Sequence, residues 1–158
     1  KRIAHITGSI NLNNSNNRLY GYLDALQDAD IAVDESLIHY YEFQLSSIDQ
    51  FLNGLIKKKS IDGLFVFNDY VANYAINYLT SQGVKVPDDV SVFGFSDEPV
   101  ATYSTPQIST VEQVGAKMGL LASQKMVSIL NHNEPNTNEK IVINPKLEIR
   151  DTTRKPKR

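Results

Sequence analysis

Short apolar runs alternate with amphipathic stretches from residue 3 to residue 95. The apolar runs predict four strands, over residues 3–7, 37–41, 61–67 and 90–95. Between them, apolar side chains recur at the spacing of a helix with one buried face. They predict three helices, which begin near Ser15, at Ser46 or Ser47 as the N-cap, and near Val71, and Gly83 is predicted to end the third. Strands that alternate with helices pair in parallel through crossovers, so the pattern predicts an α/β fold with a doubly wound parallel sheet.

The pattern changes after Pro106. A long amphipathic stretch predicts a helix over residues 111–130, and two short apolar runs predict strands over residues 141–143 and 147–149. The last segment, residues 150–158, is polar and basic. We expect it to be a mobile, solvated terminus, with a nucleic-acid-binding arm as the alternative.

Composition limits the possible functions. The 158 residues are 41% hydrophobic, enough for one sizeable core, and 16 basic against 18 acidic residues leave a net charge of -2. With this balance of charges, no overall electrostatic attraction draws the chain to nucleic acid or to an anionic membrane. No apolar run is long enough to span a membrane, so we expect a cytoplasmic protein without a membrane partner. The chain has no cysteine and its three histidines are scattered, so we expect no metal and no cofactor.

The most informative motif is the segment 86–95, followed after a polar break by residues 105–111. Gly94 allows a close backbone approach at the end of a buried strand, the edge where open α/β sheets bind ligands. The order of residues in this motif resembles the effector-sensing half of LacI/GalR-type transcriptional regulators. Three further motifs carry the same resemblance, at residues 18–26, 65–69 and 145–153.

The resemblance implies a periplasmic-binding-protein-like fold of type I and a division of the chain. Residues 1–106 would form the effector-binding subdomain, residues 107–144 a helix and a strand of a truncated second subdomain, and residues 145–158 a return strand and a basic tail. It also implies that the chain is a fragment, since it starts at the first strand of the effector-binding subdomain without an initiator Met. DNA would then be bound only through a helix-turn-helix headpiece outside this chain.

Five residues are candidates for ligand binding: Arg18, Phe43, Asn68, Ser96 and Asp97. In the family reading Arg18 donates to effector oxygens, whereas its alternative role is a solvated arginine at a helix start. Asn68 and Asp69 can bind ligand hydroxyls or cap the next helix, and we interpret Asn68 as the ligand contact and Asp69 as the structural residue. The resemblance implies that Phe43 packs on the effector, whereas its alternative place is the core. Ser96 stands where family members commonly have Asp, with Asp97 next to it. The resemblance implies a small-molecule effector, a sugar or sugar derivative whose identity stays open.

A dimer interface is also implied by the resemblance. Family members pair through the helix after residue 69 and the loop after residue 95, which here carry Asn73, Tyr74, Asn77, Tyr78 and Tyr103. Tyrosine is frequent in interfaces because its ring is apolar and its tip is polar. We expect a homodimer, built either on this tyrosine patch or on the helix predicted over residues 111–130.

Enzymatic alternatives have little support in the sequence. The segment from Gly94 to Glu98 resembles a nucleophile elbow, but Glu98 occupies the position of the final glycine. No dinucleotide-binding or phosphate-binding glycine motif is present. We therefore expect no enzyme but the effector-sensing and dimerisation region of a transcriptional regulator. The alternatives are part of an extracytoplasmic sugar- or solute-binding protein and, second, an α/β hydrolase.

Overall fold

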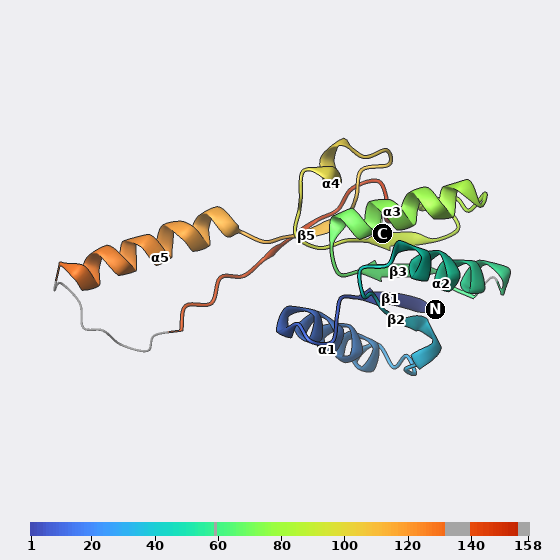
Figure 1. Ribbon diagram of the computed structural model, residues 1–158, viewed down its shortest axis with the longest axis horizontal. Coiled ribbons are helices and arrows are strands. Elements are labelled where there is room, and N and C mark those ends of the chain that lie inside the picture. Colours follow the sequence, from blue (N-terminus) through green and yellow to red (C-terminus); the bar gives the residue numbers. More distant parts are fainter. Residues whose placement is uncertain (59, 132–139, 155–158) are drawn as a thin grey trace.

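The computed structural model describes residues 1–58, 60–131 and 140–154, and its centre is a four-stranded sheet (Figure 1). The strands are β1 (Ile3–Thr7), β2 (Ile38–Tyr40), β3 (Gly63–Val66) and β4 (Ser91–Phe93). Their order in the sheet is β2-β1-β3-β4, and every pair is parallel. The predicted doubly wound sheet is confirmed. The first strand has the predicted bounds, and the other three are shorter than their apolar runs.

Helices cover both faces of the sheet, as the alternating side chains of the strands require. One face packs on α1 (Asn13–Asp28), whose Leu19, Tyr22 and Leu26 form a buried cluster with Ile3 and Phe65. The opposite face carries the main core, under α2 (Leu45–Lys57) and α3 (Asp69–Ser81). A short 3-10 turn, η1 (Glu35–Leu37), precedes β2. In Figure 1, α1 lies on one side of the sheet and α2 and α3 on the other.

The four-stranded sheet and the helices packed on it form the main body of the structure. The chain leaves this body after the short helix α4 (Val100–Tyr103) and returns alongside the segment by which it left. The outgoing strand β5 (Thr110–Glu112) pairs antiparallel with the returning strand β6 (Lys146–Glu148). Between them, α5 (Gly115–Leu130) projects from the body and buries none of its residues (Figure 1). No helix in the described ranges is long and apolar enough to cross a membrane.

Several sequence predictions about the exit and return of the chain are wrong. Residues 110–112 form a strand, so the helix predicted from residue 111 begins at Gly115. Residues 141–143 form no strand, and the return strand lies one residue earlier than predicted, at Lys146–Glu148. The described part of the tail is fixed, because the Thr152 side chain is fully buried and its carbonyl accepts a hydrogen bond from the Val92 amide. Residues 155–158 of the predicted tail lie outside the described residues.

The predicted serine cap of the second helix is also wrong. Helix α2 begins at Leu45 after Gln44, and no side chain caps it. The Ser47 hydroxyl donates to the Gln44 carbonyl instead, at 2.7 Å. The predicted end of α3 is confirmed, because Gly83 follows the helix with φ of +78°, the left-handed conformation that glycine adopts without strain.

Candidate ligand site at the carboxyl edge of the sheet

The predicted ligand residues that follow strands meet at one edge of the sheet. Phe43 follows β2, Asn68 follows β3, and Ser96 and Asp97 follow β4. Because all four strands are parallel, their carboxyl ends lie at the same edge. Arg18 reaches this edge from α1, since its guanidinium carbon lies 4.1 Å from the centre of the Phe95 ring. The structure thus brings the candidates to the part of an open α/β sheet that binds ligands.

Backbone strain is concentrated at this edge. Phe43, Ser96 and Asp97 have φ values of +61°, +114° and +56°, and Asp30 is the one other non-glycine residue with positive φ in the described chain. Such conformations are unfavourable for residues with a Cβ, and they persist where surrounding contacts impose them. Three of them in two loops at one edge mark those loops as candidates for a function.

Asp69 is the buried polar centre beneath these loops. Its carboxylate accepts a 2.7 Å hydrogen bond from the Thr110 hydroxyl and a 2.8 Å bond from the Glu98 amide, and its side chain is fully buried. The first residue of α3 is thereby tied to β5 and to the loop after β4. The sequence interpretation of Asp69 as a structural residue is confirmed by these bonds.

Gly94 makes room for that carboxylate. A Cβ at Gly94 would collide with the Asp69 carboxylate and press on Ile108. The close approach predicted from the sequence therefore exists, and Asp69 is the group that approaches.

Gly94→Ala is expected to lower the free energy of unfolding by about 2 kcal/mol, since a methyl group forced into a packed site displaces its neighbours. Gly54→Ala is the matched control, because Gly54 lies in α2 and a Cβ added there would have no other atom within 4 Å. That control is expected to raise the stability by up to about 1 kcal/mol through helix propensity. Urea unfolding of both variants measures the difference, and equal effects would contradict the steric account.

Arg18 is neither fully solvated nor paired with a single partner. It is half-buried over the Phe95 ring, and burial lowers the pKa of its guanidinium while the charge of Asp69 raises it. Its alternative role as a solvated arginine is wrong. A guanidinium held against an aromatic face keeps its edge donors available for ligand oxygens.

Asn68 and Phe43 differ in how free their side chains are. The Asn68 carbonyl oxygen caps α3 by accepting a 2.8 Å bond from the Val71 amide, so the helix-capping role exists. Its amide nitrogen makes no hydrogen bond within the described residues and can donate to a ligand. Phe43 is 73% exposed and touches the Tyr41 ring at a centroid distance of 5.7 Å. The alternative of a core phenylalanine is therefore wrong.

Ser96 and Asp97 form a turn held by other segments. The Ser96 amide donates to the Val111 carbonyl at 2.9 Å, and its hydroxyl accepts a 3.4 Å bond from Gln113. Asp97 Oδ1 lies 2.7 Å from Arg150 Nη2, an ion pair whose angles fall outside those of a hydrogen bond. Sequence reasoning missed Gln113 and Arg150, because both approach this turn from segments far along the chain.

An open groove of about 890 Å³ lies along the α1 face of the sheet, and of the five candidate ligand residues Arg18 alone lines it. Arg18 and Gln113 are among its few polar side chains, and apolar ones dominate the rest, including Phe65, Phe93 and Phe95. Phe95 belongs to the motif at residues 86–95, but nothing in the sequence indicates that its ring packs against the Arg18 guanidinium. Among the described residues, no group of histidines and carboxylates is placed to hold a metal ion.

The predicted interface residues lie on α3 and α4. Tyr103 is 69% exposed, whereas Tyr74 and Tyr78 are half-buried and pack against the core. The Tyr74 hydroxyl donates to Asp49 at 2.8 Å, and this bond raises its pKa. Of the two asparagines, Asn77 is exposed and Asn73 is half-buried.

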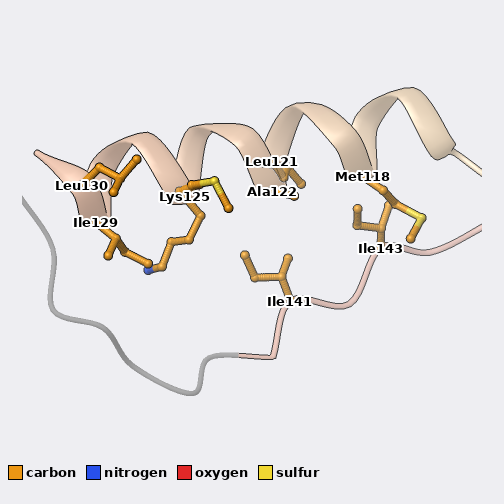
Figure 2. Close-up of a pocket in the computed structure, with 9 residues that line it drawn as sticks. Met118, Leu121, Ala122, Lys125, Ile129, Leu130, Ile141 and Ile143 are labelled. Atoms are coloured by element: carbon orange, nitrogen blue, oxygen red, sulfur yellow. The ribbon is translucent and has the colours of Figure 1, made fainter.

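The alternative association surface is α5. Its apolar side chains face residues 141–143 across a groove of about 670 Å³. Figure 2 shows Leu121 and Ile129 of the helix on one side and Ile141 and Ile143 on the other.

The chain matches the family of periplasmic binding protein-like domains over residues 1–153, and it belongs to that family. Among its curated relatives, the HTH-type transcriptional regulator DegA of Bacillus subtilis is 32% identical over 151 residues. That match covers 96% of this chain and 44% of DegA. The chain thus spans about half the length of the curated relatives it matches.

Solved structures give the same result. A sugar-binding LacI-family regulator from Escherichia coli, solved with phosphate, is 32% identical and has a TM-score of 0.83 over 96% of this chain and 54% of that chain. A complex of the regulator CelR with cellobiose is 28% identical, with a TM-score of 0.83 over 96% of this chain and 46% of that chain. The resemblance to LacI/GalR-type regulators and the predicted fold are confirmed. These relatives are transcriptional regulators rather than enzymes, in agreement with the sequence expectation.

Proposed function

We propose that this chain is the effector-binding and dimerisation part of a transcriptional regulator and that its ligand is a sugar or sugar derivative. The observation that carries the proposal is the placement of Asn68 and the Ser96–Asp97 turn after parallel strands that end at one edge of the sheet, with Arg18 stacked on the neighbouring Phe95. These groups offer a forked cationic donor, an amide donor, and hydroxyl and carboxylate oxygens, which together match the hydroxyl groups of a carbohydrate. The exposed ring of Phe43 suits the apolar face of a sugar.

The proposed division of the chain follows from the resemblance to LacI/GalR-type regulators. Residues 1–106 form the effector-binding subdomain, residues 107–144 belong to a second subdomain, and residues 145–158 return to the first. In the whole regulator, ligand between the two subdomains would bias their relative orientation and so the spacing of paired DNA-binding headpieces. DNA is then bound through a headpiece outside this chain.

Weak sugar binding is the first expected result. D-ribose, D-glucose and cellobiose, titrated into the full chain, are expected to bind no tighter than about millimolar, because one wall of a cleft buries only part of a ligand. Amide shifts in nuclear magnetic resonance spectra should fall on Arg18, Asn68, Ser96 and Asp97. Micromolar binding would contradict the one-wall interpretation, and shifts confined to other residues would contradict the proposed site.

Phe43→Ala tests the contribution of the aromatic ring. The variant is expected to weaken the binding of whichever sugar binds by about tenfold, as expected for the loss of a stacked aromatic contact. Tyr20→Ala is a matched control, because Tyr20 is an aromatic side chain that is 60% exposed on α1 and not in a loop at the carboxyl edge of the sheet. An equal loss of sugar affinity in Phe43→Ala and Tyr20→Ala would mean that the Phe43 ring makes no specific contact with the sugar.

A homodimer is the expected oligomeric state, built on the tyrosine patch or on α5. Tyr103→Asp tests the patch with little cost to the fold, because this side chain is 69% exposed and not in the core. Met126→Asp tests α5, where Met126 is 65% exposed. In sedimentation equilibrium, the variant that becomes monomeric identifies the interface. A monomeric parent chain at high concentration would contradict both versions.

The extracytoplasmic solute-binding protein stays as the alternative, since the family is one of periplasmic binding protein-like domains. The regulator is favoured because the relatives reported above are transcriptional regulators.

A further inference from the structure

Arg150 joins three segments that lie far apart in the sequence. Its Nη2 atom is 2.7 Å from Asp97 Oδ1 in the turn after β4. Its Nη1 atom donates to the Ile108 carbonyl at 2.9 Å, and its backbone amide donates to the Ser109 hydroxyl at 2.8 Å. The side chains of Arg150 and Asp97 are 15% and 20% exposed, so their ion pair is largely shielded from solvent. The contacts fix the guanidinium between the turn and the strand that leaves the body.

The turn that Arg150 contacts is the most strained part of the described backbone. Ser96 and Asp97 are consecutive and both have positive φ, at +114° and +56°. Such conformations are unfavourable for non-glycine residues, so the turn depends on contacts that hold it. The backbone bond from Ser96 to Val111 holds one end, and the ion pair with Arg150 holds the side chain at the other.

We propose that Arg150 is a positioning residue of the ligand site and that, by binding Asp97, it imposes the left-handed conformation of the Ser96–Asp97 turn. The role of Arg150 in ligand binding rests on the proposed ligand site. Its effect on the φ angles of Ser96 and Asp97 does not. Because Arg150 also binds Ile108 and Ser109, which lead into β5, the turn is tied to the segment through which the chain leaves the body. Arg150 thereby adds a side-chain link to the backbone bond that already joins Ser96 to Val111 in β5.

The experiment uses the full chain and reads the backbone directly. Three-bond couplings across the N–Cα bond distinguish positive from negative φ, and they are measured at Ser96 and Asp97 in the parent chain and in Arg150→Gln. We expect the positive-φ values of the parent to be lost at both residues in the variant. Asp97→Asn removes the charge from the other end of the pair and leaves the Ile108 bond in place, so a loss of positive φ is expected at Ser96, whereas asparagine itself tolerates positive φ at position 97. It also decides the question if Arg150→Gln does not fold.

Arg154→Gln is the matched control. Arg154 lies in the same terminal segment but donates to the carbonyls of Pro87 and Asp88, away from the turn. Its variant is expected to keep the parent couplings. Retention of positive φ at Ser96 in both Arg150→Gln and Asp97→Asn would overturn the proposal, and so would an equal loss in Arg154→Gln.

A cellobiose titration of the same samples separates this proposal from the proposed function. If cellobiose binds the parent chain, Arg150→Gln is expected to raise its Kd by about tenfold, since a displaced turn loses at least one hydrogen bond to the ligand. An unchanged Kd would overturn the positioning role. If cellobiose shifts no resonance of the parent chain, that result counts against the carbohydrate assignment, and the couplings still decide whether Arg150 holds the turn.

Discussion

Asp69→Ala is expected to lower the free energy of unfolding by about 3 kcal/mol, because it deletes two hydrogen bonds to a fully buried carboxylate. The Thr110 hydroxyl and the Glu98 amide would lose their partner in a site that water does not reach. For a chain of this length the loss corresponds to a fall of roughly 10 °C in Tm. Calorimetry or urea unfolding measures it.

Two variants make the Asp69 result specific. Asp69→Asn keeps the shape and an acceptor oxygen, so a smaller loss is expected than for alanine. Asp24→Ala changes an exposed aspartate on α1 and is expected to stay within about 0.5 kcal/mol of the parent. If Asp69→Ala were as stable as Asp24→Ala, the carboxylate would not be the centre that joins α3, β5 and the loop after β4.

Acidification is expected to destabilise the fold through His5. This side chain is fully buried between the rings of Tyr22 and Phe65, at centroid distances of 5.0 and 4.7 Å. Its Nδ1 atom donates to the Phe65 carbonyl at 3.0 Å, and its Nε2 atom has no partner within the described residues. Burial therefore lowers the pKa of His5 from 6.5 to about 4, although the bond to Phe65 raises it.

The direction of the pH effect follows from these values. Below pH 6.5 the unfolded chain binds a proton at His5 that the folded chain binds only near pH 4, so stability is complete above pH 6.5 and falls between 6.5 and 4. The loss from this group is about 3 kcal/mol at pH 4. His5→Phe keeps an aromatic ring in the stack and is expected to remove this part of the pH dependence.

His39→Phe is the control for the His5 prediction. His39 is half-buried against the Phe51 ring, and burial lowers its pKa as well, but its Nε2 atom has the Ser47 hydroxyl as a partner. We expect its substitution to leave most of the acid sensitivity in place. If the stability of His5→Phe fell between pH 6.5 and 4 as steeply as that of the parent chain, His5 would not be the group responsible.

The central sheet could be predicted because its signals are local. Ala4 and Ile6 face α2 and α3 while Ile3 and His5 face α1, and this alternation within one short strand defines two buried faces. The glycine after α3 is equally local, since it depends on one backbone position. Gly94 likewise indicates a close approach, but the approaching group, Asp69, lies in another segment and has no local signal. The alternating burial of a strand and the glycine that ends a helix are both determined by residues within a few positions in the sequence.

The exit and return of the chain could not be predicted because they depend on distant partners. Val111 and Val114 fit a helical spacing, but Val111 pairs with Leu147 across the antiparallel ladder. The basic tail resembles a solvated terminus in the sequence, whereas Thr152 accepts a hydrogen bond from the Ser109 amide and becomes fully buried. Periodicity within one segment carries no information about a partner in a distant segment of the chain.

The candidate site shows the same division. That residues after β2, β3 and β4 would share an edge follows from parallel pairing, while the choice of Phe43 and Ser96 within those loops comes from the family resemblance. The stacking of Arg18 on Phe95 and the ion pair between Asp97 and Arg150 are tertiary contacts. The positive φ values of Phe43 and Ser96 have no sequence signal, because phenylalanine and serine rarely adopt them.

The most direct test of whether this chain is the effector-binding part of a regulator is the coding sequence upstream of Lys1. We expect it to encode a helix-turn-helix headpiece followed by the remaining strands and helices of the second subdomain, in one reading frame with this chain. A secretory signal peptide in that position, with no helix-turn-helix, would contradict the regulator and support an exported solute-binding protein.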